Sequence, residues 1–332
     1  MSNRNPYTGK PMQLRLEKTV MNFRKEPFEV IYHSYFCEDT GEEFEDDSLS
    51  VINYTQVVDL YREKHNIPFP EQIKAIRESY GLSARRISEI LGLGTNTWRL
   101  YENGEVPTIA NARLIQLIGD PANFLKHITE FGACEEREIE KMKKKIGEIQ
   151  EDISRQHLLE TMFQVTLPDK STGFSMFNKE KTEQVISYFT GKMQPYKTAM
   201  NKLLFYADFL HFKRTGRSIT GLRYAAIDFG PVPDHYGALY EMMFDSGIIL
   251  ISGSMTDYGF TERFLLPEGK ETNTSVFTEQ EMETLQKVFE ELNGKSTVEI
   301  VDLSHKEDAW VQYQSTKSII PYFMAFYLKA IK

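Results

Sequence analysis

The sequence predicts an α+β fold that is mainly helical, with a small β unit at its N-terminus. Three observations predict this class. Residues 1–50 are rich in β-formers and turn signals, short helical segments follow one another closely over residues 70–128, and residues 180–332 mix helical with strand-like patterns. At about 150 residues per domain, a chain of 332 residues has room for two domains and a smaller third unit.

The composition excludes several classes of protein. Hydrophobic residues make up 41% and charged residues 26%, so wholesale disorder is not expected. The two cysteines, Cys37 and Cys134, argue against a disulfide scaffold. A net charge of −9 excludes a chain that is basic overall, although a small DNA-reading module fits inside an acidic chain. Because the apolar stretches are short and no secretory signal is visible, we expect a cytoplasmic protein without a membrane partner.

The first expected elements are two paired strands and a helix. Residues 28–36 are rich in β-branched and aromatic residues with rough alternation, and they run into a turn signal at Asp39–Gly41. Residues 11–25 are expected to pair with this strand. Residues 51–64 carry apolar residues at helical spacing, and the two prolines that follow mark the boundary of the unit.

Two segments of this β unit share a spacing, Asn5-Pro6-Tyr7-Thr8-Gly9 and Cys37-Glu38-Asp39-Thr40-Gly41. They resemble the two CxxC pairs, each followed by glycine, that hold zinc in MqsA-type antitoxins, in which a linker and a helix-turn-helix follow. Three of the four thiolates are replaced here by Asn5, Thr8 and Thr40, which are poor zinc ligands. We therefore expect no bound metal, and a unit held by packing or by hydrogen bonds among the replacements.

Four short helices are expected next, because capping and stop residues recur at short intervals. Ser83 is a favourable N-cap, Gly92 closes the helix that follows, and Thr95 can cap the third helix. Helices this short bury their apolar faces only as one compact bundle. The expected helices cover residues 71–80, 84–91, 96–102 and 108–118.

The second and third of these helices carry the pattern of a DNA-reading module. Ile87 gives the helix 84–91 a buried side, and Trp98 and Tyr101 pack the helix 96–102 back onto the bundle. With these residues, the stretch from Ile73 to Pro107 resembles the lambda-repressor-like helix-turn-helix family, which implies that the helix 96–102 reads the major groove. Asparagine can pair with adenine and arginine with guanine. The candidate DNA-binding residues are Arg85, Gly94, Thr95, Asn96, Thr97 and Arg99.

The charge of this module leaves an alternative open. Its basic and acidic residues nearly balance, so a dimer, which doubles the contacts to phosphates, would strengthen binding to operator DNA. The alternative is a helical bundle that has kept the fold and lost DNA binding.

A charge-dense helix with one apolar stripe is expected over residues 133–157, because isoleucine and methionine recur at spacings of three and four. Two interpretations stay open. The stripe can pack on its own chain as part of a linker helix, or it can form the contact of a homodimer. The residues of the stripe are Ile139, Met142, Ile146, Ile149 and Ile153.

The remainder of the chain mixes helices and strands beyond a boundary loop at Pro168–Gly173. A strand is expected over residues 222–229, and residues 248–252 and 261–266 are expected to form a hairpin. The expected helices cover residues 183–189, 196–212, 235–246, 278–292, 297–302, 305–314 and 318–330.

Four stretches of this region carry a second family resemblance. They are Asn201–His211, Thr215–Gly221, Tyr224–Pro233, which ends in Gly-Pro-Val-Pro, and Leu303–Trp310, which contains Ser-His-Lys-Glu-Asp-Ala-Trp. These stretches resemble the Panacea domain, also called SocA-like. The resemblance implies an antitoxin, because Panacea domains occur in antitoxins that neutralise unrelated toxins, and one relative acts as a proteolytic adaptor for its toxin.

Aromatic residues gather around two loops of this region. Gly230–Pro233 is interpreted as a rigid loop that displays its flanks, with a plain chain reversal as the alternative, and the loop 253–260 is a second candidate. Aromatic side chains beside a rigid loop are well suited to hold a partner protein. The candidate toxin-binding residues are Tyr224, Phe229, Pro231, Pro233, Tyr236, Tyr240, Tyr258 and Phe260.

The sequence gives little support for an enzyme. It contains no HExxH, no GxSxG and no Gly-rich phosphate loop. His305 follows Ser304 at an expected helix start, where it can cap or hydrogen-bond the turn, and Trp310 is expected to anchor the core. We therefore expect no catalytic residue, no cofactor and no metal, although the role of His305 stays open.

These inferences together predict the antitoxin of a type II toxin–antitoxin system. It would bind a protein toxin through its C-terminal domain and repress its own operon, as a homodimer, through the helix-turn-helix. Two alternatives remain, a prophage or stress transcriptional regulator without a toxin, and a proteolytic adaptor. The expected domains are a zinc-knuckle-like unit (1–66), a DNA-binding domain (67–130), a linker helix (131–170) and a Panacea domain (171–332).

Overall fold

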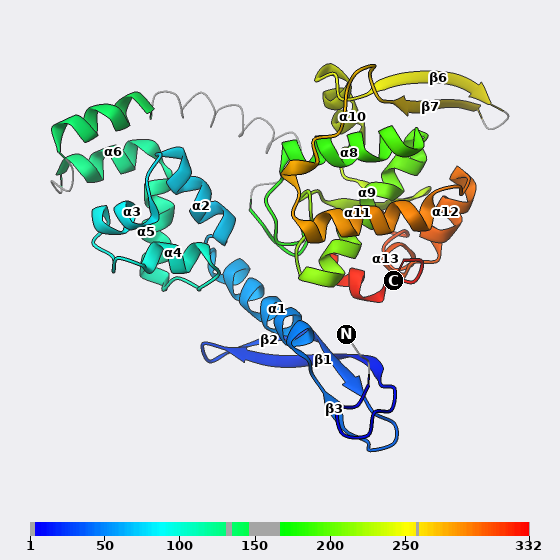
Figure 1. The fold of residues 1–332 in the computed structure, drawn as a ribbon, viewed down its shortest axis with the longest axis horizontal. Coiled ribbons are helices and arrows are strands. Elements are labelled where there is room, and N and C mark those ends of the chain that lie inside the picture. The colour runs from blue at the N-terminus through cyan, green and yellow to red at the C-terminus, as the bar shows by residue number, and fades with distance from the viewer. Residues whose placement is uncertain (1–3, 131–134, 146–166, 257–258, 332) are drawn as a thin grey trace. The chain divides into compact units, whose positions relative to one another are not determined.

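A computed structural model describes residues 4–130, 135–145, 167–256 and 259–331 of the chain. It is an α+β fold with many helices, a small N-terminal sheet and small sheets further along, as predicted (Figure 1). The chain divides into two compact units, one formed by residues 1–12, 33–52 and 162–332 and the other by residues 13–32 and 53–161. No helix in the described part of the chain is long and apolar enough to cross a membrane.

The N-terminal sheet has the strand order β1-β2-β3, with β1 Gln13–Phe23, β2 Glu26–Phe36 and β3 Glu43–Phe44. Arg24 and Lys25 join β1 to β2, and both have positive φ angles, 48° and 69°, as a two-residue hairpin turn requires. The predicted pairing of residues 11–25 with residues 28–36 is therefore confirmed.

The helix that follows the sheet, α1 Asp47–His65, begins four residues earlier than the sequence predicts. Asp46 explains the early start, because its Oδ1 accepts the N–H of Leu49 at 2.9 Å and so caps the first turn. Further along, the side chain of Gln56 exchanges two hydrogen bonds with the backbone of Ile31 in β2, at 2.9 and 2.8 Å. This pair fixes the helix against the strand.

The helix bundle consists of α2 Pro70–Ser79, α3 Ala84–Ile90, α4 Thr97–Glu102, α5 Ile109–Gly119, α6 Pro121–Glu130 and the helical residues 136–145. Ser83 caps α3 as predicted. The cap of α4 differs, because Asn96 and not Thr95 occupies that position. The helix α6 follows directly after α5, since Asp120 Oδ1 accepts the N–H groups of Ala122 and Asn123 and starts a new helix.

The C-terminal part, residues 167–331, is built around one helix, α9 Lys197–Thr215. Every residue of α9 from Ala199 to Phe212 is buried. This is possible because α9 contacts neighbours along its length, among them α8 Lys179–Met193, α11 Glu279–Leu292 and α12 Thr297–His305. A helix that is buried all round forms the core of the fold rather than one covering layer.

Two small antiparallel hairpins complete the C-terminal part. The first pairs β4 Tyr224–Ile227 with β5 Gly230–Pro233, and the second pairs β6 Leu250–Thr256 with β7 Gly259–Leu265. The helix α10 Tyr236–Asp245 connects the two hairpins. Gly-Pro-Val-Pro is therefore a buried strand, which corrects its interpretation as a loop, because its residues pair one by one with β4.

The last fifty residues differ from the sequence prediction in two places. The helix expected over residues 305–314 is reduced to α13 Asp308–Val311, because α12 continues to His305. The helix expected over residues 318–330 is a short 3₁₀ helix, Tyr322–Tyr327. The chain cannot be helical before Pro321, since Ile320 donates its N–H to Tyr224 O at 2.8 Å and Ile319 bridges to Ala225 beside β4.

One buried carboxylate ties α9 to the chain that follows it. Asp208, fully buried, accepts the N–H groups of Ile219 at 2.8 Å and Thr220 at 2.9 Å. It also accepts the hydroxyl of Thr220 and, at 2.7 Å, the hydroxyl of Tyr224. These donors fix residues 219–224, and therefore fix where β4 begins.

We predict that Asp208→Asn destabilises the protein strongly. The amide would turn an NH₂ group toward a site that holds only donors, so at least one buried hydrogen bond would be lost and one donor left unpaired. The expected loss in free energy of unfolding is about 2–4 kcal/mol, measured by urea denaturation. Asp228→Asn is the matched control, because Asp228 is exposed and pairs with Lys317 at the surface. Equal stability of the two variants would contradict the role given to Asp208.

Candidate functional site

The hairpin of β4 and β5 is held rigidly from three sides. Lys202, fully buried on α9, donates from Nζ to Pro231 O at 3.0 Å. Gly230 has φ 94°, and a Cβ placed there would lie 2.6 Å from Ser304 Oγ, so any other residue would strain the backbone and displace a neighbouring side chain. Trp310 donates its indole N–H to Ile227 O at 2.7 Å. The turn of this hairpin is therefore fixed in position by α9, α12 and α13.

Two side chains next to the base of the β4–β5 hairpin, His305 and Lys202, are themselves partly or fully buried. The ring of His305 stacks on Trp310 with 4.0 Å between centroids, and His305 lies at the end of α12 and not at a helix start. Burial lowers the pKa of Lys202 to about 7, so its amine is only partly charged near neutral pH. Lys202 therefore contacts the hairpin directly, and His305 contacts it only through Trp310.

The residue that the hairpin displays is Phe229. It sits at the turn between Ile227 and Gly230, and 69% of its surface is exposed. An aromatic ring on a rigid turn loses little conformational freedom on binding, which favours it as a contact for a partner protein.

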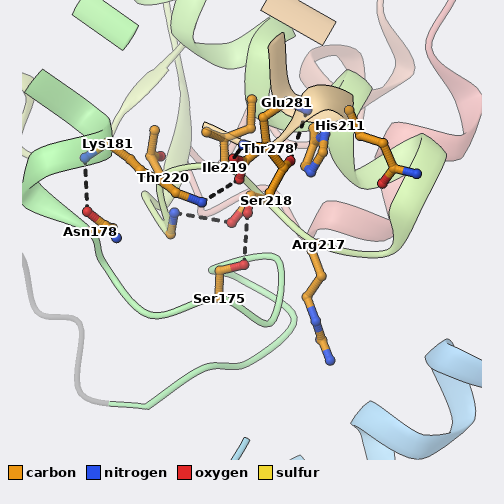
Figure 2. A network of polar contacts seen from close by, with 12 residues as sticks. Ser175, Asn178, Lys181, His211, Arg217, Ser218, Ile219, Thr220, Thr278 and Glu281 are labelled. Atoms are coloured by element: carbon orange, nitrogen blue, oxygen red, sulfur yellow. Dashed lines mark hydrogen bonds and ion pairs between the residues drawn. The ribbon is translucent and has the colours of Figure 1, made fainter. Parts of the chain in front are cut away.

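A second rigid cluster clamps three helices together at the other side of α9. Glu281 accepts Lys181 Nζ at 2.6 Å and the N–H of Thr278 at 2.8 Å, which joins α11 to α8 (Figure 2). His211, buried on α9, lies 3.3 Å from the hydroxyl of Thr284 on α11. Burial lowers the pKa of His211 to about 4, so its imidazole is neutral near pH 7. Neutral His211 and paired Glu281 therefore act as structural groups.

The candidate toxin-binding residues differ in how far the structure exposes them. Phe229 and Phe260 are exposed, by 69% and 67%, and Tyr236 is half-buried. Tyr258 lies outside the described residues. The remaining four are buried in the C-terminal part, so they are unavailable as direct contacts: Tyr224, Pro231, Pro233 and Tyr240.

The burial of the two tyrosines has a specific cause. The hydroxyl of Tyr224 donates to Asp208, and that of Tyr240 donates to Asn201 Oδ1 at 2.7 Å. Burial raises the pKa of both phenols well above the ordinary value, so they stay protonated as donors. Each hydroxyl has an acceptor inside the core, which allows a residue with a polar tip to be fully buried.

Sequence analysis missed several exposed apolar residues of the C-terminal part. Phe244 on α10 and Leu250 and Met255 on β6 expose about half or more of their surface. Val298 on α12 and Val311 on α13 do the same. The signal that could have found Met255 is its place in a strand directly opposite Phe260, but that pairing depends on a register that the sequence leaves open.

The candidate DNA-binding residues lie together at the start of α4. Gly94, Thr95, Asn96 and Arg99 are exposed, and Thr97 is half-buried. Arg85 on α3 is exposed as well, and its Nε lies 2.9 Å from Glu89 Oε1. Leu100, 47% exposed on α4, is an addition that the sequence analysis did not make.

Buried polar contacts fix α4 within the bundle. Glu102 accepts Arg77 Nε at 2.6 Å and the indole N–H of Trp98 at 2.9 Å, which joins α4 to α2. The backbone N–H of Trp98 donates to Ser88 Oγ at 3.1 Å, which joins α4 to α3. Asn96 and Arg99 therefore extend from a helix whose orientation is set from two sides.

The two described members of the predicted apolar stripe pack on their own chain. Met142 is buried in the core of the helix bundle, and Ile139 packs against the same core. These two residues therefore make the contacts that we expected of a linker helix, whose apolar stripe packs on its own chain. Ile146, Ile149 and Ile153 lie outside the described residues.

The two segments with zinc-knuckle spacing come together around Cys37. Asn5 is buried, and its Oδ1 accepts the N–H groups of Tyr7 at 2.8 Å and Thr8 at 3.1 Å. Thr40 and Asn5 hydrogen-bond the buried Cys37 side chain and lower its pKa. Within the described ranges, no three His, Cys, Asp or Glu side chains gather as a metal site would require. Hydrogen bonds thus connect the positions that thiolates occupy in a knuckle.

Comparison with known families identifies one part of the chain. Residues 200–311, from α9 to α13, match the family described as antitoxin SocA-like, Panacea domain. The chain therefore carries a SocA-like Panacea domain, which favours an antitoxin role and a toxin partner. The segment includes Lys202, Asp208 and the hairpin of β4 and β5. Comparisons with curated proteins and with solved structures gave no match.

We predict that His211 makes stability depend on pH in a defined window. Its pKa is about 4 in the folded protein and about 6.5 when unfolded, so the unfolded state binds the proton first as the pH falls. The contribution of His211 is fully present above pH 6.5 and is lost progressively down to pH 4. The loss is at most about 3 kcal/mol.

The measurement is the free energy of unfolding at pH 7, 5.5 and 4 for the wild type and for His211→Gln. Glutamine keeps a polar atom near Thr284 and does not titrate. The wild type is expected to lose more stability than the variant between pH 7 and pH 4. Parallel curves for the two proteins would contradict the prediction.

Proposed function

We propose that this chain is the antitoxin of a type II toxin–antitoxin pair, which neutralises a protein toxin by binding it through the C-terminal part. The observation that carries the proposal is the SocA-like Panacea domain at residues 200–311. We further propose that α3 and α4 act as a helix-turn-helix that represses the operon shared with the toxin. A homodimer would place two such modules on the two halves of an operator.

The chemistry of the C-terminal part supports binding rather than catalysis. The buried carboxyl groups of Asp208, Glu281 and Glu307 are engaged by their own chain. Glu307, for example, accepts the N–H groups of Lys329 and Ala330, both at 2.9 Å, and the hydroxyl of Tyr206. The exposed groups that stand out are apolar instead, among them Phe229, Met255 and Phe260. Neutralisation would then follow from covering the toxin's active site or from holding the toxin in an inactive conformation.

The geometry of the helix bundle supports a DNA contact at α4. Asn96 and Arg99 are exposed, and their side chains match adenine and guanine edges in the major groove. The bundle as a whole is nearly neutral because its basic and acidic residues nearly balance, and Arg77 and Arg85 each pair with a carboxylate. In a dimer, contacts of a few side chains with base edges would therefore contribute more to the free energy of DNA binding than attraction to phosphates.

The two activities can be separated with two double variants of the full chain. Phe229→Ala with Phe260→Ala removes the exposed aromatic rings and leaves α4 intact. Asn96→Ala with Arg99→Ala removes two base-reading side chains and leaves the C-terminal part intact. All four residues are exposed, so both variants are expected to fold.

The readouts are rescue of growth when the adjacent gene is expressed and retardation of the operon's own promoter DNA in a gel. The aromatic variant should lose rescue, with toxin affinity at least about tenfold weaker, and should retain the DNA shift. The Asn96 and Arg99 variant should rescue growth and bind promoter DNA at least about tenfold more weakly.

Other outcomes would favour the alternatives. A promoter shift without any rescue by the wild type would favour a transcriptional regulator that has no toxin. Rescue accompanied by a shorter half-life of the toxin would favour a proteolytic adaptor. Unchanged DNA binding by the Asn96 and Arg99 variant would contradict the helix-turn-helix assignment.

A further inference from the structure

The hairpin of β6 and β7 is anchored at one end and projects beyond the helices of the C-terminal part (Figure 1). Phe264 on β7 is fully buried, and its ring contacts Tyr240 with 4.6 Å between centroids. Glu262 accepts Lys197 Nζ, from the first turn of α9, at 2.7 Å. These contacts hold the base of the hairpin.

The two edges of this hairpin differ. The outer edge of β7 is partly covered, because Phe264 donates its N–H to Pro195 O at 2.9 Å and Arg263 bridges to Tyr196. Among the described residues, no strand pairs with the outer edge of β6, since its sheet has the order β6-β7 only. The edge of β6 is therefore open along seven residues.

The register determines which backbone groups of β6 lie on the open edge. The N–H of Phe264 points to Pro195, away from β6, so Phe264 and its partner Ile251 form a pair without mutual hydrogen bonds. Such pairs alternate along an antiparallel ladder. The N–H and C=O groups of Ile251, Gly253 and Met255 therefore point away from β7, ready to pair with a further strand.

The sequence of β6 lacks the usual protection of an open edge. Natural proteins place lysine, proline or a bulge on edge strands, because free backbone groups otherwise pair with other chains. The residues Leu250–Thr256 contain neither charge nor proline, whereas β7 carries both Glu262 and Arg263. An edge that stays unprotected in this way is suited to bind a strand.

An ordered apolar pair lies beside this edge. Met255 and Phe260 are directly opposite one another, and they expose 79% and 67% of their surfaces. A Cβ placed on Gly253 would lie 2.5 Å from the ring of Phe260, so the ring lies across the glycine. The ring thus already packs on the backbone of β6, and this contact lowers the entropic cost of ordering it on binding.

We infer that the edge of β6 binds an extended, uncharged segment of the toxin as an added antiparallel or parallel strand. Backbone hydrogen bonds to Ile251, Gly253 and Met255 would hold this strand, and Met255 and Phe260 would contact its apolar side chains. The inference rests on the proposed antitoxin function and specifies how the toxin is held. Because backbone pairing depends little on side chains, the same edge could accept strands of different sequence.

A second copy of this chain is a poorer occupant of the same edge. Antiparallel pairing of two β6 strands about their centre would place Gly253 opposite Gly253 and Ser252 opposite Ser254. Glycine weakens a strand interior and offers no side chain for cross-strand contact. A toxin strand with larger side chains can instead contact Met255 and the Phe260 ring that lies across Gly253.

The test compares Met255→Pro with Met255→Ala in the full chain. Both remove the methionine side chain, and only proline also removes the N–H on the open edge. The probe is the toxic product of the adjacent gene, as a catalytically inactive variant, in a quantitative binding assay. Met255→Pro should bind at least tenfold more weakly than Met255→Ala, at equal melting temperature.

Hydrogen exchange of the wild-type complex gives a second measurement without substitution. The amides of Ile251, Gly253 and Met255 should exchange at least tenfold more slowly in the complex than in the free chain. Equal affinity of the two variants, or unchanged exchange at these amides, would overturn the β6 inference alone. A wild type that neither binds nor neutralises the product would overturn the proposed function with it. Loss of a dimer on Met255→Pro would identify a second copy as the occupant and overturn the inference.

Discussion

The C-terminal part depends on one buried carboxylate. Asp208 sits on a helix that is covered on all sides, where an uncompensated charge or acceptor would be costly. Four donors from residues 219–224 satisfy it. Burial raises the pKa of this carboxyl, and the hydrogen bonds from the four donors lower it again. The buried carboxylate is therefore stable only when all four donors are in place. The start of β4, and with it the exposed turn at Phe229, is fixed as a consequence.

The helix bundle follows the same physical rule with a different residue. Glu102 accepts hydrogen bonds from Arg77 and from the indole of Trp98, so a nearly buried acid orients α4 as Asp208 orients β4. In both places the polar groups inside the fold hold a neighbouring element in a fixed orientation. The groups proposed to meet a partner, Asn96 on α4 and Phe229 on the β4–β5 turn, are exposed and are held from beneath.

Part of the candidate site was predictable from residue types and spacing. Exposed Asn96 and Arg99 followed from the buried positions of Trp98 and Tyr101, because a short helix that packs one side must present the other. The aromatic residues of the C-terminal part were harder to sort. Tyr224 is buried because its hydroxyl reaches Asp208, sixteen residues away in sequence, and no local pattern reveals that acceptor.

By itself, the sequence determined the fold class, the paired N-terminal strands, the short capped helices and the resemblance to a Panacea domain. These features rest on local periodicity, on caps and turns, and on recognisable motifs. Only the tertiary structure decided that Gly-Pro-Val-Pro is a buried strand, that Met142 lies in the bundle core, and that β6 has an open edge. The reason is physical, since burial, register and free edges are properties of which segments meet, and distant segments meet through contacts that no single stretch of sequence contains.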